Sequence, residues 1–317
     1  MEKEYNSPLL QSELDEEQEI VVLTEGSQVI SAGPGSGKTR VLTSKARRTM
    51  DEGKSVICLC FTRSASKEMA SRVEGLPATT IHSYCCGVVG WEESWGYTGL
   101  LYRYLLEKEK TKFDLVLCDE FQDLNQLELE VVLEMVGKDI FAVGDPYQSI
   151  YGFQGAMGIG VANVLKGMGA KEQVLHNNYR SCPQIIRKIE SIFKRDLVSA
   201  SIKENNLTAI LCRTNDDVFL VSRELLKAGI PHHVRLGVGR AEEGQRNKDY
   251  ISKSNLRVST IHVAKGQEFD RVIIFGWHPD LAIQEEKRTY YVACSRASKE
   301  LYETDNIEEV IELVKEN

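Results

Sequence analysis

The sequence predicts an α/β protein of two domains, in each of which helices cover both faces of a parallel sheet. Short apolar runs alternate with segments of helical pattern along the chain, an order typical of parallel strands joined by crossover helices. A glycine-rich loop pattern lies between the first apolar run and a helical segment. The length of 317 residues suits two domains of ordinary size. We place them at residues 1–172 and 173–317.

Each predicted domain has its own series of elements. Strands are expected at Gln28–Ser31, Ser55–Phe61, Asp114–Asp119 and Asp139–Val143, then at Ala209–Cys212, Arg257–Ile261 and Arg271–Phe275. Helices are expected at Arg40–Met50, Ser64–Val73, Asn125–Val136, Pro183–Lys194, Asp216–Ala228 and Glu285–Ala297. Ser181 and Asn215 are the expected N-caps of two of these helices, and Gly229 is an expected left-handed stop. The polar stretch Gly237 to Lys253 predicts an irregular excursion.

The glycine-rich loop fits a phosphate-binding pattern, with Ala32 standing where the pattern has its first glycine. Its glycines let the backbone curl so that N–H groups point at phosphate oxygens, and the following helix adds its positive end. Lys38 would reach the β- and γ-phosphates, and the Thr39 hydroxyl would bind magnesium. A plain glycine-rich turn is the alternative. The predicted triphosphate site comprises Ala32, Gly33, Pro34, Gly35, Ser36, Gly37, Lys38 and Thr39.

A second motif, Asp119-Glu-Phe-Gln-Asp123, ends an apolar strand in two carboxylates. Ligands in open α/β sheets sit at the carboxyl ends of strands, where this pair would emerge. Asp119 can hold magnesium, directly or through water, and Glu120 can orient or deprotonate the attacking water. Taken alone, the motif is equally typical of a solvated acidic turn. Together with the upstream loop, it favours a hydrolytic site.

Composition narrows the class of protein. The net charge of -8 excludes a uniformly basic nucleic-acid coat, so a polyanion would have to meet a local basic groove. The sequence has no secretory signal pattern and no apolar run long enough to span a bilayer. None of the eight cysteines forms a C-x-x-C pair, which favours buried, reduced thiols over a zinc or iron–sulfur site. We expect a soluble, cytoplasmic protein in a reducing compartment, with no membrane contact.

In order along the chain, the motifs resemble those of the UvrD/Rep group of superfamily 1 helicases. The resemblance covers nearly the whole length, and its specificity comes from the number and order of the motifs. The matching segments are Leu14–Gln18, Phe61–Ala65, Thr80–Ser83, Asp119–Asp123, Val143–Ala156, Asn178–Ser181, Ala209–Asn215, Val258–Phe269 and Tyr290–Ala297.

The resemblance implies two RecA-like domains with ATP between them. Arg180 and Arg296 would supply positive charge to the transferring phosphate in the transition state, although a surface salt bridge is the common fate of an arginine. Further nucleotide contacts implied are Gln18 on the adenine edge, Arg40 and Tyr179 on the two faces of the ring, Gln148 at the γ-phosphate and Glu268 at the nucleotide or its ribose.

The same resemblance implies contacts with single-stranded DNA. Phe61, Tyr151 and Phe153 are the candidates for base stacking, with burial in the core as the alternative. The other residues implied on the DNA side are Thr62, His82, Thr260 and His262. For the two histidines, an ordinary core or surface position is the alternative.

Two departures from the family concern its accessory subdomains and its polar contacts. The segments Tyr84–Phe113 and Ser181–Ser259 are too short for the usual large insertions, and the first contains Trp91 and Trp95. Gln154 stands where the family more often has Arg, and Gln267 where it has Leu. We therefore expect a minimal ATP- and Mg²⁺-dependent translocase or helicase on single-stranded DNA, of 3′-to-5′ polarity, that needs a protein partner or second copy for processive unwinding. An ATP-switched subunit of a larger complex, an RNA-directed motor and a small-molecule kinase are the alternatives.

Overall fold

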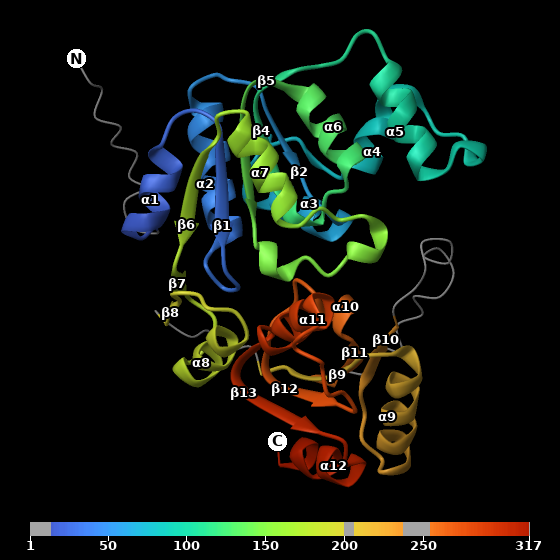
Figure 1. Cartoon of the computed structure of the whole chain (residues 1–317). Helices are drawn as coiled ribbons and strands as arrows, with labels where there is room; N and C mark the ends of the chain where they lie inside the picture. Colours follow the sequence, from blue (N-terminus) through green and yellow to red (C-terminus); the bar gives the residue numbers. More distant parts are fainter. Residues whose placement is uncertain (1–13, 200–205, 237–253, 317) are drawn as a thin grey trace. The chain divides into compact units, whose positions relative to one another are not determined.

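The computed structural model describes residues 14–199, 206–236 and 254–316, and these form two compact units, 1–176 and 177–317 (Figure 1). The expected irregular stretch, Gly237 to Lys253, lies outside the described residues. The division falls after His176, beyond the strand β6 (Lys171–Leu175). The expected boundary after residue 172 would have cut that strand.

The first unit is built on a six-stranded sheet in the order β3-β2-β4-β5-β1-β6. Every pair of neighbouring strands is parallel, as the apolar runs predicted. The strands are β1 (Gln28–Ala32), β2 (Val56–Leu59), β3 (Ala78–Thr79), β4 (Phe113–Asp119), β5 (Val136–Gly144) and β6. Parallel neighbours put all their carboxyl ends at one edge of the sheet, which is where ligands bind in open α/β sheets.

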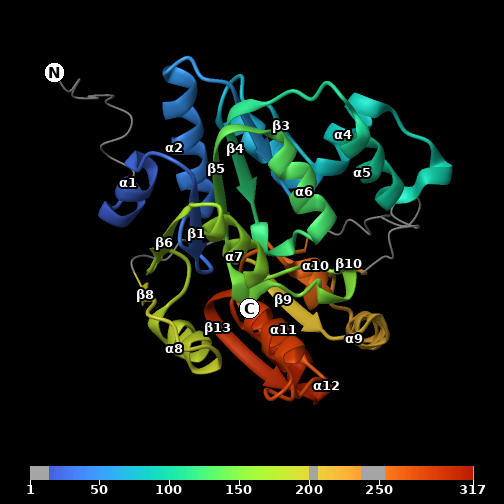
Figure 2. The ribbon, with the colours of Figure 1, turned by 45° about the horizontal axis from the view of Figure 1, so that its top comes forward.

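Helices cover both faces of this sheet (Figures 1 and 2). One core packs Ile30, Cys58 and Leu117 against α1 (Glu16–Leu23), α2 (Lys38–Asp51) and α3 (Arg63–Arg72). The opposite core packs Val29 and Ile57 against four other helices. These are α4 (Ile81–Val89), α5 (Gly96–Leu106), α6 (Gln126–Met135) and α7 (Ile159–Gly167). Residues next to each other in a strand thus point into different cores, as the pleat requires.

The segment that replaces the family's large insertion is helical. It consists of the end of α4, the short 3₁₀ helix η1 (Glu93–Trp95) and α5. The buried side chains of Leu100, Leu101 and Tyr104 join α5 to the core beneath it. This part of the chain is therefore a small helical layer of the first unit.

The second unit has a five-stranded parallel sheet in the order β10-β11-β9-β12-β13. Its strands are β9 (Thr208–Cys212), β10 (His233–Arg235), β11 (Leu256–Thr260), β12 (Phe269–Phe275) and β13 (Ala297–Thr304). Two further short strands, β7 (Asn177–Asn178) and β8 (Val198–Ser199), pair with each other. The helices are α8 (Pro183–Ile192), α9 (Asn215–Lys227), α10 (Ile261–Ala264), α11 (Gln284–Cys294) and α12 (Ile307–Lys315).

The helix caps correct two predictions. Cys182, not Ser181, is the N-cap of α8, because the Ser181 hydroxyl donates to the Ala297 carbonyl instead. Thr214, not Asn215, caps α9 through a reciprocal pair of hydrogen bonds with Asp217. Gly229 does follow α9 in the left-handed conformation, with φ of 71°.

All eight cysteines are free thiols, and six of them are buried. The described residues contain no group of three or more His, Cys, Asp or Glu side chains placed to hold a metal ion. Within the same part of the chain, no helix combines the length and apolar character needed to cross a membrane.

Candidate active site

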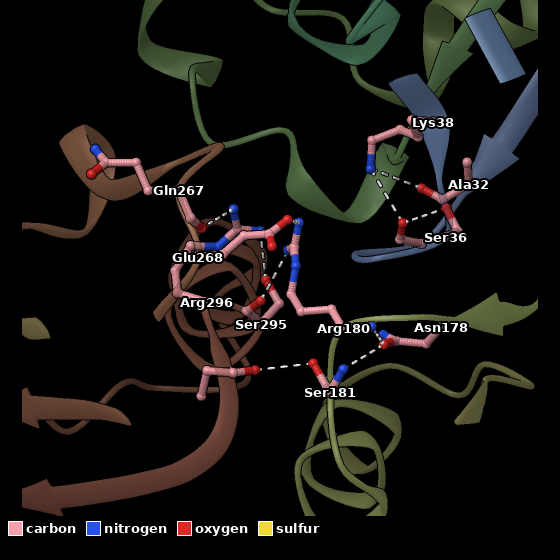
Figure 3. A network of polar contacts seen from close by, with 12 residues as sticks. Ala32, Ser36, Lys38, Asn178, Arg180, Ser181, Gln267, Glu268, Ser295 and Arg296 are labelled. Carbon is pink, nitrogen blue, oxygen red and sulfur yellow. Dashed lines mark hydrogen bonds and ion pairs between the residues drawn. The ribbon is translucent and has the colours of Figure 1, made fainter. Parts of the chain in front are cut away.

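The phosphate loop joins β1 to α2 in the strand–loop–helix context that the motif requires. Gly35 and Gly37 have φ of 68° and 82°, so the loop uses the left-handed region that favours glycine. The Ser36 hydroxyl donates to the Gly33 carbonyl at 2.8 Å. Lys38 begins α2, and its Nζ donates to the carbonyls of Ala32 and Gly33 at 3.3 and 3.2 Å (Figure 3). The ammonium group thus lies across the loop, where an incoming phosphate would exchange for these carbonyls.

Gln18 lies against this loop and is fully buried. Its Nε2 donates to the Ser36 carbonyl at 3.0 Å, and a Cβ on Gly37 would lie only 2.5 Å from that nitrogen. Asp15 and Gln18 also form the capping box that begins α1. The residue predicted to read adenine is therefore built into the support of the phosphate loop. Thr39 and Arg40 occupy the first turn of α2, and both are half-buried.

The carboxylate motif lies at the carboxyl end of β4. Asp119 is the last residue of the strand, and Glu120 follows in the left-handed conformation with φ of 52°. That conformation is uncommon for a residue with a side chain, and strained backbone is concentrated at functional sites. Burial and the neighbouring Glu120 charge raise the pKa of Asp119 to about 7, and Lys38 opposes the shift. Carboxylate oxygens such as those of Asp119 and Glu120 are the hard donors that Mg²⁺ prefers.

The next strand along the sheet, β5, leads into a short helix that carries Gln148. This helix, η3 (Pro146–Gln148), is capped by Asp145, whose side chain accepts from the Tyr147 amide at 3.1 Å. Gln148 is buried, and its Nε2 donates to Asp145 Oδ2 at 3.1 Å. The predicted γ-phosphate sensor is therefore held at the same edge of the sheet as Asp119 and Glu120.

Three aromatic side chains form a continuous ladder at this edge. Phe61 follows β2, and its ring stacks on that of Tyr151 with centroids 5.1 Å apart. Phe153 meets Tyr151 edge-on at 6.0 Å. Burial and the charges of Asp123 and Glu120 raise the pKa of Tyr151. The ladder follows β2 and β5, the strands on either side of β4, which ends at Asp119. Phe61 is 37% exposed and Phe153 65% exposed, so the core-packing alternative is wrong for these two rings.

Two other predicted DNA-side residues have evident structural roles. Thr62 is the N-cap of α3, where its hydroxyl accepts from the Ala65 amide at 3.1 Å. His82 is half-buried between aromatic rings, with Tyr97 at 5.6 Å and Trp91 at 5.2 Å between centroids. Trp91 itself is 48% exposed. About half of the surface of this tryptophan is therefore packed against the first unit and the rest is open to solvent.

In the second unit, Arg180 is held by its own unit (Figure 3). Its guanidinium forms an ion pair with Glu268 and donates to the Ser295 carbonyl at 3.3 Å. The turn that presents it is built by Asn178, whose Oδ1 accepts from the amides of Arg180 and Ser181 at 2.9 and 2.7 Å. Two predicted nucleotide contacts, Arg180 and Glu268, are thus brought together, and Tyr179 lies half-buried between Asn178 and Arg180 in the chain.

Arg296 is the most deeply buried charged side chain of the predicted site, with 1% of its surface exposed. Its guanidinium donates to the carbonyls of Val292 and Gln267 at 3.1 and 3.2 Å and to the Ser295 hydroxyl at 2.9 Å. In this conformation, Arg296 ties α11 to the turn before β12. The sequence marks Gln267 as a departure from the family but does not indicate its role: its side-chain oxygen accepts from Arg257 at 3.1 Å, and its nitrogen donates to the Val263 carbonyl at 2.8 Å.

The remaining two DNA-side predictions lie at the carboxyl end of β11. Thr260 is buried, and its hydroxyl has no hydrogen-bond partner among the residues that the structure describes. His262 is half-buried in the first turn of α10. Thr260 is the last residue of β11, as Asp119 is of β4, and His262 comes two residues after β11, as Phe61 does after β2.

Comparisons with known proteins agree with this architecture. Residues 17–154 match the AAA domain family, and residues 240–306 match the UvrD-like helicase C-terminal domain. A Pif1 helicase from Candida albicans has the same fold, with a TM-score of 0.57 and 16% identity over 96% of this chain and 99% of that one. The fold and the loop define a P-loop ATPase with two RecA-like domains. The chain carries domains of the UvrD-like superfamily 1 helicases, an AAA domain followed by a UvrD-like helicase C-terminal domain.

The curated relatives are considerably longer than this chain. A probable DNA helicase of Mycoplasma pneumoniae is 25% identical over 244 residues, which span 62% of this chain and 44% of the relative. The ATP-dependent DNA helicase PcrA of Staphylococcus epidermidis is 25% identical in an alignment of 292 residues. This alignment covers 57% of this chain and 40% of the relative. The chain thus spans less than half the length of these relatives.

Proposed function

We propose that this protein is an ATP-driven motor that moves along single-stranded DNA. The observation that carries the proposal is the ladder of Phe61, Tyr151 and Phe153, whose two phenylalanine rings are open to solvent, at the same edge of the sheet as the Asp119–Glu120 carboxylates. Bases of any sequence can stack on such rings, which suits a protein that steps along a strand. A ladder next to the hydrolytic carboxylates supports coupling between strand binding and ATP turnover.

In the proposed mechanism, the phosphate loop binds the triphosphate through backbone amides and the Lys38 ammonium group. Glu120 orients and deprotonates the attacking water, while Gln148 contacts the γ-phosphate. Thr39 and Asp119 would hold a magnesium ion, which neutralises phosphate charge when bound. Burial and Glu120 raise the pKa of Asp119 and Lys38 opposes the rise; a bound cation would likewise favour the carboxylate form.

Arg180 and Arg296 of the second unit are proposed to stabilise the transferring phosphate. Arg180 would exchange its ion pair with Glu268 for the phosphate, since that pair is partly open to solvent and such pairs are weak. Arg296 is held by three hydrogen bonds within its unit. Its contribution therefore requires a rearrangement of those contacts, and it is the less accessible of the two.

We further propose 3′-to-5′ polarity, the direction implied by the family resemblance, and poor unwinding of long duplexes by a monomer. In the first unit, the only structure between α4 and β4 is η1 and α5, which leaves a small feature to meet a duplex. A protein partner or a second copy would then supply processivity. The alternatives are an ATP-switched DNA-binding subunit with little unwinding of its own and an RNA-directed motor.

Strand displacement on substrates with 3′ or 5′ single-stranded tails tests these proposals. We expect displacement of short duplexes from 3′ tails, with activity falling steeply as the duplex lengthens. Lys38→Ala is the matched inactive control. Activity confined to 5′ tails would contradict the polarity, and efficient unwinding of long duplexes by a proven monomer would contradict the minimal motor. ATP-dependent binding to DNA with neither translocation nor displacement would favour the switched subunit.

A further inference from the structure

Gln122 bridges the ends of two neighbouring strands at the proposed hydrolytic site. Its side chain is completely buried. Its Nε2 donates to Glu120 Oε2 at 2.7 Å, and its Oε1 accepts from the Asp145 amide at 3.0 Å. Asp145 is in turn the hydrogen-bond partner of Gln148. A single amide therefore lies between the proposed base and the segment that carries the proposed γ-phosphate sensor.

The chemistry of its partners fixes which way this amide points. The Asp145 backbone N–H can only donate, so the oxygen of the amide must face it. The nitrogen must then face Glu120, whose carboxylate is an acceptor when ionised. Hydrogen bonds to charged groups are shorter and stronger than those between neutral groups, which agrees with the 2.7 Å distance. The orientation of Gln122 is thus determined at both ends.

Neighbouring groups also hold the backbone and the side chain of Gln122 in place. Its carbonyl accepts from the Ser149 hydroxyl and the Gly158 amide, both at 3.1 Å. On the opposite side, a Cβ at Gly144 would overlap Gln122 Oε1 and lie 2.9 Å from Phe121 Cδ1. Gly144 is needed here for space, because the amide occupies the volume that a side chain would fill. The left-handed backbone of Glu120 directs its carboxylate to the same amide.

We propose that Gln122 is a positioning residue that holds the Glu120 carboxylate in place for catalysis and links it to the Gln148 segment. A movement of Gln148 on contact with the γ-phosphate is transmitted through Asp145 and Gln122 to Glu120. Orientation of the base thereby follows occupancy of the phosphate site. This inference rests on the proposed role of Glu120 as the base.

Two substitutions distinguish the hydrogen bond to Glu120 from the hydrogen bond to Asp145. Gln122→Glu keeps an oxygen for the Asp145 amide and removes the donor to Glu120, whereas Gln122→Met removes both contacts. We expect each to lower kcat for ATP by about 10–100-fold, the usual effect of losing an outer-shell partner. The Kd for ATP should change much less. Gln28→Glu is the matched control, because Gln28 is another fully buried amide, in β1, that donates to the Thr24 carbonyl.

A double-mutant cycle with Glu120→Gln distinguishes positioning from a general loss of structure. If Gln122 acts through Glu120, Gln122→Met should have little further effect on single-turnover hydrolysis in the Glu120→Gln background. Additive losses, with Glu120→Gln strongly impaired but of measurable single-turnover rate, would overturn the inference alone. Wild-type turnover by Glu120→Gln would refute the base assignment and the inference with it. Should Gln122→Met fail to fold, Gly144→Ala displaces the same amide, and wild-type kcat in that variant would also overturn the inference.

Discussion

The ring of Phe61 stacks on the ring of Tyr151, with 5.1 Å between centroids and 25° between planes. The two residues follow different strands of the first sheet, β2 and β5, and Phe153 extends the stack outward. A stack of this kind, open to solvent at its end, presents a face to a base. It is the feature that most directly relates the fold to single-stranded nucleic acid.

Phe153→Ala should weaken binding of single-stranded DNA by about 1–3 kcal/mol, the value of one stacked base. ATP hydrolysis without DNA should be unchanged, because the ring is 65% exposed and carries no group that could take part in the chemical step. Fluorescence anisotropy with a labelled oligonucleotide measures the first effect. Phe219→Ala is the control, since Phe219 is a similarly exposed phenylalanine on α9. Equal affinity of both variants for DNA would remove Phe153 from the binding site.

Arg180→Ala should lower kcat by about 10³-fold, as loss of other arginine fingers does, with a much smaller change in Kd for ATP. Glu268→Ala frees the same guanidinium from its ion pair. Because that pair is partly open to solvent, its removal should change the free energy of unfolding by less than about 1 kcal/mol. Steady-state kinetics and urea unfolding of both variants test this. A loss confined to ATP affinity in Arg180→Ala would assign the arginine to ground-state binding.

Arg296→Ala should lower stability as well as activity. The substitution leaves the Val292 and Gln267 carbonyls without their buried donor, and an unsatisfied buried group costs about 1–3 kcal/mol. We expect a Tm several degrees below wild type, measured by calorimetry, together with loss of turnover. A variant of unchanged Tm and abolished kcat would show that the buried network is dispensable and that the role of Arg296 is chemical only.

Glu120→Gln should bind ATP with near wild-type affinity and fail to hydrolyse it. The phosphate loop and its Lys38 ammonium group remain, while the water loses its base. Equilibrium binding of a fluorescent ATP analogue and single-turnover hydrolysis report the two effects separately. If this variant instead lost ATP binding, the carboxylate would belong to the metal or nucleotide contacts and not to the chemical step.

Much of this architecture follows from local sequence signals. The apolar runs predicted the central strands β1, β2, β4 and β5, because buried parallel strands are nearly continuous in apolar residues. β6 was missed, since its sequence Lys171–Leu175 is mostly polar and lies at the edge of the sheet. The helices α4 and α5 were missed because glycines and aromatic residues interrupt their pattern.

Site residues that belong to a local motif could be predicted from the sequence. Residues whose role depends on contacts between distant segments could not. The loop at Lys38 and the carboxylates at Asp119 are adjacent in sequence to the strands that place them. The bridge made by Gln122 joins segments that only the sheet brings together, so no local pattern indicates it. The same holds for the burial of Arg296, which depends on the turn at Gln267 and the end of α11.

The central claim is that single-stranded DNA stimulates ATP hydrolysis at the phosphate loop. Steady-state ATPase activity with and without DNA and RNA homopolymers tests it most directly, with Lys38→Ala as the inactive control. The account predicts low basal hydrolysis that DNA stimulates strongly and RNA stimulates less. Hydrolysis that is unchanged by any nucleic acid, or that persists in Lys38→Ala, would contradict it.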